Sequence, residues 1–131
     1  MQHSNFSFLE REFPILFNLA CSAEYNLYTD APVALIKMRV LEEKIVEYIF
    51  EEHNLEKPYD NTLHNRIKIL EDEKIFLPNI ASLIHGIKHK GNIAAHESKG
   101  SIDDAKTTLM SAFKVAKWFY ETYSEENRSL A

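Results

Sequence analysis

The stretch DAPVALIKMRVLEEKIVEYIFEEH, residues 30–53, carries the clearest structural signal in the chain. Its apolar residues recur at intervals of three and four, the spacing of one face of an α-helix; they are Leu35, Met38, Leu41, Ile45 and Ile49. Asp30 is a good N-cap residue, and Pro32 stands early, where its missing N–H is not needed. The remaining surface is expected to carry Glu42, Glu43, Glu47, Glu51 and Glu52. The stretch therefore predicts a long helix with one face in a core.

The rest of the chain contains residues that typically start and end helices, and these predict a series of further helices. Asn5 is expected to cap a short first helix, and Pro14 to open a second that runs to about Tyr25. Later helices are expected from 61 or 62 to 74, from 77 to about 97, and from 101 to about 124. The buried positions expected on the helix from Pro14 are Ile15, Leu19, Ser22 and Ala23, and those on the last helix include Leu109, Ala112, Phe113, Ala116 and Tyr123. Trp118 lies off that last stripe and is a candidate for contact with a partner.

Strand signals are absent from the sequence. No segment alternates apolar and polar residues as a half-buried strand does, and 3 Gly and 4 Pro are too few for the turns of a sandwich or barrel. A chain of 131 residues is the size of one domain. We therefore predict an all-α fold, a single bundle of five or six helices over residues 1–126, with a frayed polar tail over 127–131.

Charge and cysteine content exclude several functional classes. The formal net charge of −5 provides no domain-wide basic field for a nucleic-acid backbone. The single cysteine, Cys21, excludes an internal disulfide framework and a zinc site built from cysteines. No apolar run approaches the ~20 residues of a membrane span. An unpaired cysteine without an export signal fits a reducing compartment, so we expect a cytoplasmic domain without membrane contact.

The segment HGIKHKGNIAAHE, residues 85–97, has an unusual arrangement of polar residues. On a continuous helix, four of them fall within a sector of roughly 60°; they are His85, His89, Asn92 and His96. Histidines spaced four apart can share a metal ion, but the third one lies about 10 Å further along the helix. No metal site is therefore predicted from this stripe.

Two other interpretations of the stripe stay open. In the first, His96 acts as an acid or base with Asn92 one turn before it, and Lys88 or Lys90 steadies a phosphate, as cleavage of RNA by its own 2′-hydroxyl would require. In the second, Asn92 and His96 satisfy polar groups at a close helix crossing, which the small Gly91 permits. The residue types alone do not decide between them.

An ion pair and a basic cluster complete the candidate site. Arg39 and Glu43 stand four residues apart on the long helix, where a buried pair would contact the region of Asn92 and His96. The cluster of Lys88, His89, Lys90 and Lys99 suits a phosphate, although on an acidic protein such a cluster is more often solvated surface. The binding candidates are Lys88, His89, Lys90, Gly91, Asn92, His96, Arg39 and Glu43, with His96 and Asn92 as the catalytic candidates.

The segment Gly91–His96 resembles the G-N-x-A-A-H signature of a bacterial domain-of-unknown-function family. That family is common at the N terminus of type I restriction enzyme R subunits and related helicase proteins. Further matches, in order along the chain, are Asn5–Pro14, Ala34–Arg39 followed by Glu43, Leu63–Ile67, Gly100–Lys106 and Ala116–Tyr120. The resemblance covers residues 4–126.

The resemblance implies a part in DNA restriction. The R subunit of such a system joins a metal-dependent nuclease to an ATP-driven DNA translocase and assembles with methyltransferase and specificity subunits. This chain has no Gly-x-x-x-x-Gly-Lys-Ser/Thr phosphate loop and is too short to contain both a nuclease domain and a translocase domain. The resemblance therefore implies that this chain is an N-terminal module of an R subunit, or a small relative of one. Its expected role is non-catalytic docking or regulation, with other subunits of the complex as partners. ATP and Mg²⁺ would serve the parent endonuclease, and no cofactor is expected in this chain.

The chain also resembles the HEPN group of helical bundles, some of which are ribonucleases with an Arg-x4–6-His motif. His96 matches the histidine, but the positions where the arginine would stand hold His89, Lys90 and Gly91. This resemblance implies a homodimer and a groove that contacts nucleic acid weakly. It leaves two alternatives to the docking module, which are a standalone ribonuclease or nucleic-acid-binding domain using His96 and a helical protein–protein adaptor.

Overall fold

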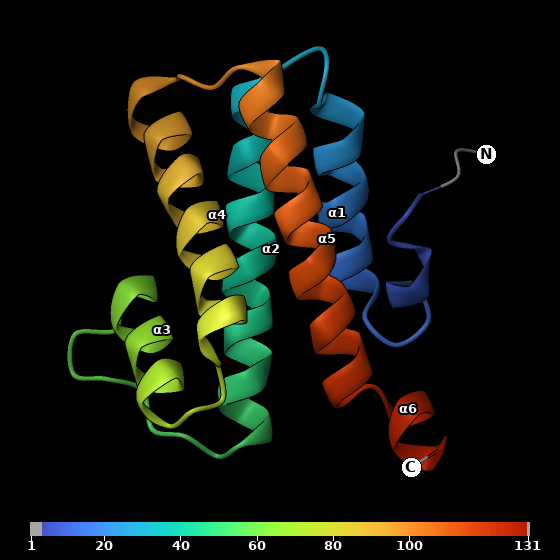
Figure 1. The fold of residues 1–131 in the computed structure, drawn as a ribbon, viewed down its shortest axis with the longest axis vertical. Helices are drawn as coiled ribbons and strands as arrows, with labels where there is room; N and C mark the ends of the chain where they lie inside the picture. Colours follow the sequence, from blue (N-terminus) through green and yellow to red (C-terminus); the bar gives the residue numbers. More distant parts are fainter. Residues whose placement is uncertain (1–3, 131) are drawn as a thin grey trace.

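The computed structural model describes residues 4–130, and these form a bundle of helices (Figure 1). A short 3₁₀-helix, η1 (Ser7–Leu9), precedes six α-helices: α1 (Pro14–Asn26), α2 (Ala31–Glu52), α3 (Leu63–Asp72), α4 (Pro78–Glu97), α5 (Ile102–Tyr123) and α6 (Glu125–Leu130). No strand occurs among the described residues. The predicted all-α bundle is confirmed.

Helices α2, α3 and α5 begin where the sequence places their caps, whereas the predicted cap Asn5 is wrong, because the N-cap position of η1 is Phe6 and no side chain caps it. The Asp30 carboxylate accepts a hydrogen bond from the main-chain N–H of Val33 at the start of α2, and Thr62 caps α3 in the same way. At the start of α5, Ser101 and Asp104 form a reciprocal capping box. Side chains thereby satisfy N–H groups that have no partner inside the helix. Local sequence therefore sets these helix starts before any tertiary packing.

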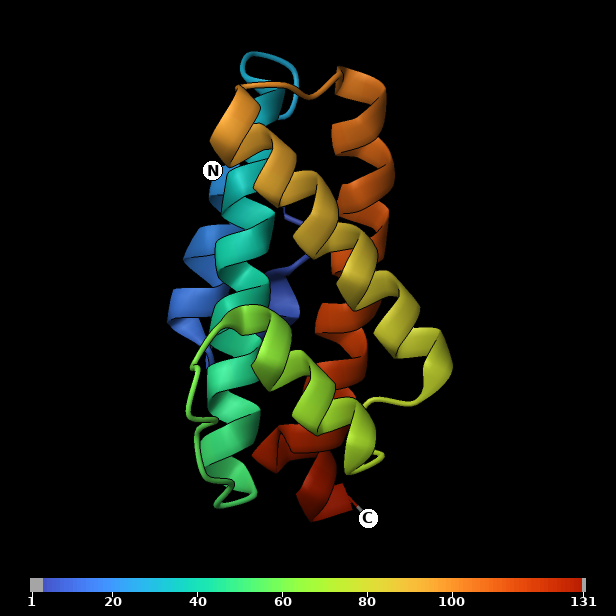
Figure 2. The same ribbon diagram turned by 90° about the vertical axis from the view of Figure 1, so that its left-hand side faces the viewer.

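Helix α2 is the centre of the bundle and packs against α1, α4 and α5. Its predicted apolar stripe is confirmed, because all five members are at most 2% exposed: Leu35, Met38, Leu41, Ile45 and Ile49. Figure 2 shows α4 crossing α2 and α5 obliquely, with α3 lying across the lower half of α2. The candidate site residues stand where α4 crosses α2.

The predicted stripe on α1 is wrong at its first position. Ile15 is 64% exposed, whereas Leu16, Ala20 and Ala23 are buried. The reason lies just before the helix, where Phe13 is buried and its ring packs against Tyr48 and Phe119. Because Phe13 occupies the first core position, the later core positions follow it at helical spacing, and Ile15 points outward.

The end of the chain is anchored to its beginning. Residues 125–130 form α6, where the sequence predicts a frayed tail over 127–131; residues 1–3 and 131 lie outside the described chain. The main-chain N–H of Glu125 donates to the Glu12 carboxylate at 2.7 Å, and the Tyr120 hydroxyl donates to Glu126. The hydrogen bond to Glu126 raises the pKa of Tyr120 to about 12. The bond from Glu125 holds the start of α6 against the segment that precedes α1, and the bond to Glu126 holds it against α5.

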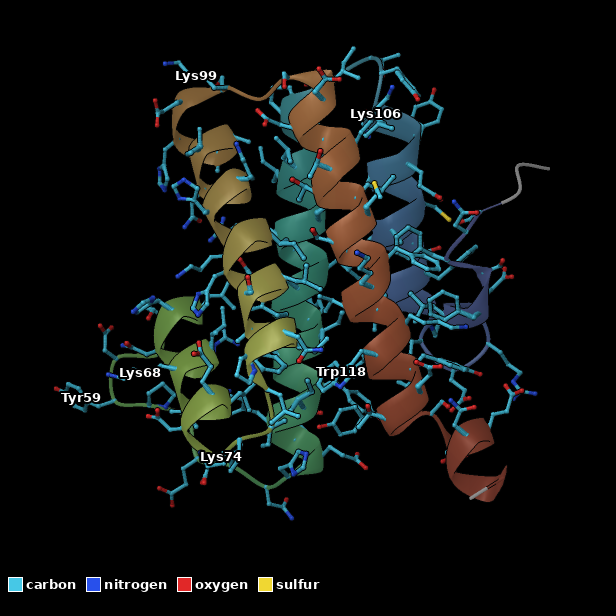
Figure 3. All side chains as sticks on the ribbon, viewed as in Figure 1. Tyr59, Lys68, Lys74, Lys99, Lys106 and Trp118 are labelled. Atoms are coloured by element: carbon cyan, nitrogen blue, oxygen red, sulfur yellow. The ribbon has the colours of Figure 1, made fainter. Side chains whose placement is uncertain are left out.

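Trp118 is covered in part by its own chain. Its ring packs edge-on against Phe76 at 5.6 Å and against Tyr123 at 6.1 Å between ring centroids. Figure 3 shows it directed toward the interior between α5 and its neighbours. Contact with a partner through Trp118 stays a prediction. Within residues 4–130, none of the helices has the length and apolar content needed to cross a bilayer.

Two glycines of α4 provide a matched test of this packing. A Cβ added at Gly91 would lie 2.5 Å from the Cβ of Arg39 on α2, whereas one added at Gly86 would meet no heavy atom within 4 Å. We expect Gly91→Ala to lower the free energy of unfolding by about 1–3 kcal/mol, because α2 and α4 must move apart. Gly86→Ala should raise it by about 0.5–1 kcal/mol, because alanine favours the helix. Urea denaturation of both variants measures the two changes in the free energy of unfolding. A change of the same sign in both variants would contradict the close crossing of α2 and α4.

Candidate functional site at the crossing of α2, α3 and α4

The candidate site forms where α4 touches α2. Gly91 faces Arg39, so the glycine permits the close helix approach that the sequence predicts there. The Arg39 guanidinium pairs with Glu43 at 3.2 Å, and both side chains are about 30% exposed. The Arg39 Nε lies buried without a hydrogen-bond partner among the described residues. Arg39 and Glu43 therefore stand beside the segment that carries the signature.

The least expected member of the site is Glu42, which is 1% exposed. Its expected place on the outer surface of α2 is wrong, and neither of its carboxylate oxygens has a hydrogen-bond partner within residues 4–130. At about 100° per residue, Glu42 lies about 40° from both Met38 and Val46, inside the apolar stripe. The position of Glu42 around the helix is the signal that could have predicted its burial. Residue type alone places every glutamate of α2 on the surface.

Burial controls the charge of Glu42. Removal from water raises the pKa of its carboxyl well above the usual value. The positive charges of Lys88 and Arg39 act in the opposite direction, and the Glu43 carboxylate adds to the increase. The Glu42 carboxyl therefore favours its neutral, protonated form, which costs less to bury than a carboxylate.

Polar contacts tie α4 to α3 on the outer side of the crossing. The Lys88 ammonium donates to Nδ1 of His64 at 2.9 Å, and His85 Nε2 bonds to the Glu71 carboxylate at 2.5 Å. Both links run from α4 to α3, which otherwise packs on few residues of the bundle. Lys88 and His85 are thus engaged within the chain.

Acidic residues neutralise the rest of the basic cluster. Lys90 pairs with Asp104 of α5 at 3.1 Å, and Lys99 with Glu97 at 3.6 Å. The hydrogen bond from Lys90 lowers the pKa of Asp104, as expected for a stabilised carboxylate. Figure 3 shows Lys99 and Lys68 at well-separated heights of the α3–α4 flank. The three lysines of the predicted cluster therefore bond to separate partners and do not converge on one site.

The histidine stripe lies on the outer face of α4. His89 and His96 are exposed and Asn92 is half-buried, whereas Ile87, Gly91 and Ala94 face the core. Within the described chain, the side chains of His89, Asn92 and His96 make no hydrogen bond, and no interaction joins Arg39 to His96. No three His, Cys, Asp or Glu side chains of this part of the protein come together as metal ligands. The crossing gathers Arg39, Glu43, Lys88 and Gly91, and leaves His96 at its margin.

The burial of Glu42 should make the free energy of unfolding depend on pH. Because its pKa is raised in the folded state, the native protein holds a proton that the unfolded chain releases above about pH 4.5. The free energy of unfolding should therefore fall by roughly 1 kcal/mol per pH unit from there up to the folded pKa. We expect Glu42→Gln to remove this decline, while Glu47→Gln, at an exposed position of α2, retains it. Urea titrations from pH 5 to 8 test this, and parallel curves for wild type and Glu42→Gln would contradict it.

Comparisons with known proteins relate this site to a family. The chain is 31% identical over 126 residues to the type I restriction enzyme EcoKI endonuclease subunit of Escherichia coli (strain K12), an alignment that covers 96% of this chain and 11% of that protein. The chain thus spans about a tenth of the length of this curated relative. No solved structure matches it. The sequence model of a domain of unknown function (DUF4145) matches residues 23–129, which include α2, the signature segment and α5. The resemblance seen in the sequence is confirmed, and the chain belongs to the DUF4145 family.

Proposed function

We propose that this chain is a non-catalytic docking or regulatory module that acts in DNA restriction within a type I restriction–modification complex. The supporting observation is the extent of the similarity, which covers 96% of this chain but 11% of a restriction endonuclease subunit. In that relative, a bundle of this size corresponds to one small unit of a large protein. A unit of this kind serves the complex by holding it together or by controlling it.

Sequence and geometry both favour docking over catalysis. The chain lacks the phosphate loop of an ATP-driven translocase, so ATP and Mg²⁺ chemistry would belong to the parent endonuclease. Its buried acid, Glu42, has a raised pKa but is sealed in the core and out of reach of a substrate. His96 is exposed, and within residues 4–130 its side chain forms no hydrogen bond or ion pair with a base, an acid or an arginine that would activate it.

Charge favours a protein partner over nucleic acid. The chain has a net charge of −5, and Lys90, Lys99 and Arg39 already pair with carboxylates. A phosphate backbone would have to displace these pairs before it gained any contact. The partners proposed here are the methyltransferase and specificity subunits of the complex, in the cytoplasm.

The docking proposal predicts a measurable complex. We expect the purified chain to bind the assembled methyltransferase and specificity subunits with a Kd of about 10 μM or tighter, the range of a modest protein interface. Analytical ultracentrifugation or biolayer interferometry measures it, with an unrelated acidic helical protein of similar size as the control. A chain that binds no better than this control would contradict the proposed function.

The docking proposal and the ribonuclease alternative make opposite predictions about His96. Because His96 lacks an activating partner, we expect the wild-type chain and His96→Ala to leave mixed RNA equally intact over hours at neutral pH. Gel electrophoresis of labelled RNA is the readout, and a ribonuclease of known activity is the positive control. Cleavage by the wild type that His96→Ala abolishes would replace the docking module with a catalytic one.

A further inference from the structure

An apolar groove opens between the start of α1 and the second half of α2. Its volume is about 280 Å³, and its apolar lining includes Pro14, Ile15 and Tyr48. Ile15 is 64% exposed and Pro14 is also exposed, so the groove presents apolar carbon to solvent at the first turn of α1. The ring of Tyr48 packs against Phe13 and Phe119, which makes that wall rigid. The groove is therefore preformed rather than opened by a ligand.

Carboxylates form the rim of this groove. Glu47 and Glu51 stand one turn apart on α2, and both are exposed or nearly so. Lys44 pairs with Glu47 at 3.6 Å, while the side chain of Glu51 makes no ion pair or hydrogen bond within residues 4–130. Glu12 also lines the groove. The rim carries three carboxylates against one ammonium, and the C-terminal end of α2 adds the negative end of its dipole.

A second groove lies on the other side of the same rim. It also measures about 280 Å³ and is lined by Glu47 and Glu51 together with Phe50 and Leu55. Lys57 and Arg66 close its far side. Glu47 and Glu51 therefore form a negative ridge between the apolar groove and a second groove whose lining is mostly polar. A helix laid in the first groove would bury its apolar face there and place its cations against the ridge.

We propose that the apolar groove and its acidic ridge are the docking surface for a cationic amphipathic helix of a partner protein, an inference that rests on the proposed function and specifies where the module binds. An amphipathic helix suits the surface, because its apolar face enters a groove while its flanking lysines or arginines meet the ridge. The free Glu51 carboxylate offers such a cation an ion pair without displacing one inside the chain. A phosphate backbone or an anionic lipid surface would be repelled by the same ridge.

A defined probe tests the surface directly. The probe is a helical peptide of about four turns made of leucine and lysine with all leucines on one face, and its control has the same composition in scrambled order. We expect fluorescence anisotropy at physiological ionic strength to show at least about tenfold tighter binding of the amphipathic peptide. Equal binding of the two peptides would mean that charge alone attracts them, which would overturn the proposal.

Matched variants locate the binding. We expect Glu47→Lys/Glu51→Lys, and separately Ile15→Ser, to weaken the amphipathic peptide at least about tenfold. Glu73→Lys/Glu97→Lys changes the net charge equally at exposed positions outside both grooves and should weaken it much less. Amide NMR shifts of the wild type should cluster in residues 12–16 and 44–51. Equal losses for the two charge-reversal variants, or shifts centred on α4, would overturn the proposal.

The same variants separate this inference from the proposed function. If the methyltransferase and specificity subunits bind wild type and Glu47→Lys/Glu51→Lys alike, docking stands and this surface is the wrong one. If those subunits bind neither, while the peptide still distinguishes the variants, the surface stands and the assignment to restriction fails. If the isolated chain dimerises and Glu47→Lys/Glu51→Lys abolishes the dimer, the occupant is a second copy, and the partner-helix proposal is overturned.

Discussion

The contact between Gly91 and Arg39 is the constraint on which the rest of the structure depends. It brings the backbones of α2 and α4 together at a point where any side chain on α4 would collide with α2. That closeness seals Glu42 from water and keeps Lys88 near enough to influence its charge. It also fixes the oblique course of α4, to which α3 is attached by the bonds of Lys88 and His85. The lack of a side chain at Gly91 therefore determines both how the bundle packs and how charges interact where α2 and α4 cross.

A buried acid at such a crossing is costly, and an apolar residue of similar volume would usually serve stability better. Glu42 is retained beside Arg39, whose own Nε is buried without a partner. Two polar groups of opposite character thus lie one turn apart in the part of the bundle that the family signature marks. Local rules of sequence design tend to be broken where a protein meets functional demands, and the α2–α4 crossing is the clearest such place in this chain.

The sequence predicted most of the fold because the fold rests on local signals. Asp30, Thr62 and Ser101 act through neighbours three residues away, and the α2 stripe needs only helical periodicity. Ile15 and Glu42 could not be placed from type alone, because Phe13 sets the register of α1 and burial of Glu42 depends on what α4 brings against it. The cluster from Lys88 to Lys99 was predicted as a group, but the bonds of Lys88 to His64, of Lys90 to Asp104 and of Lys99 to Glu97 are separate contacts that only the folded chain creates.

Charge separates two kinds of surface on this small domain. On α4, Lys90 pairs with a carboxylate and Lys88 bonds to an imidazole, so both cations already have a partner inside the chain. Along the second half of α2 the balance is reversed, because Glu51 is unpaired and lies beside exposed apolar carbon. In a complex that acts on DNA, a module with neutralised cations does not compete for the phosphate backbone. Its unpaired negative charge and apolar area are then available to a protein, which is the combination that a docking module requires.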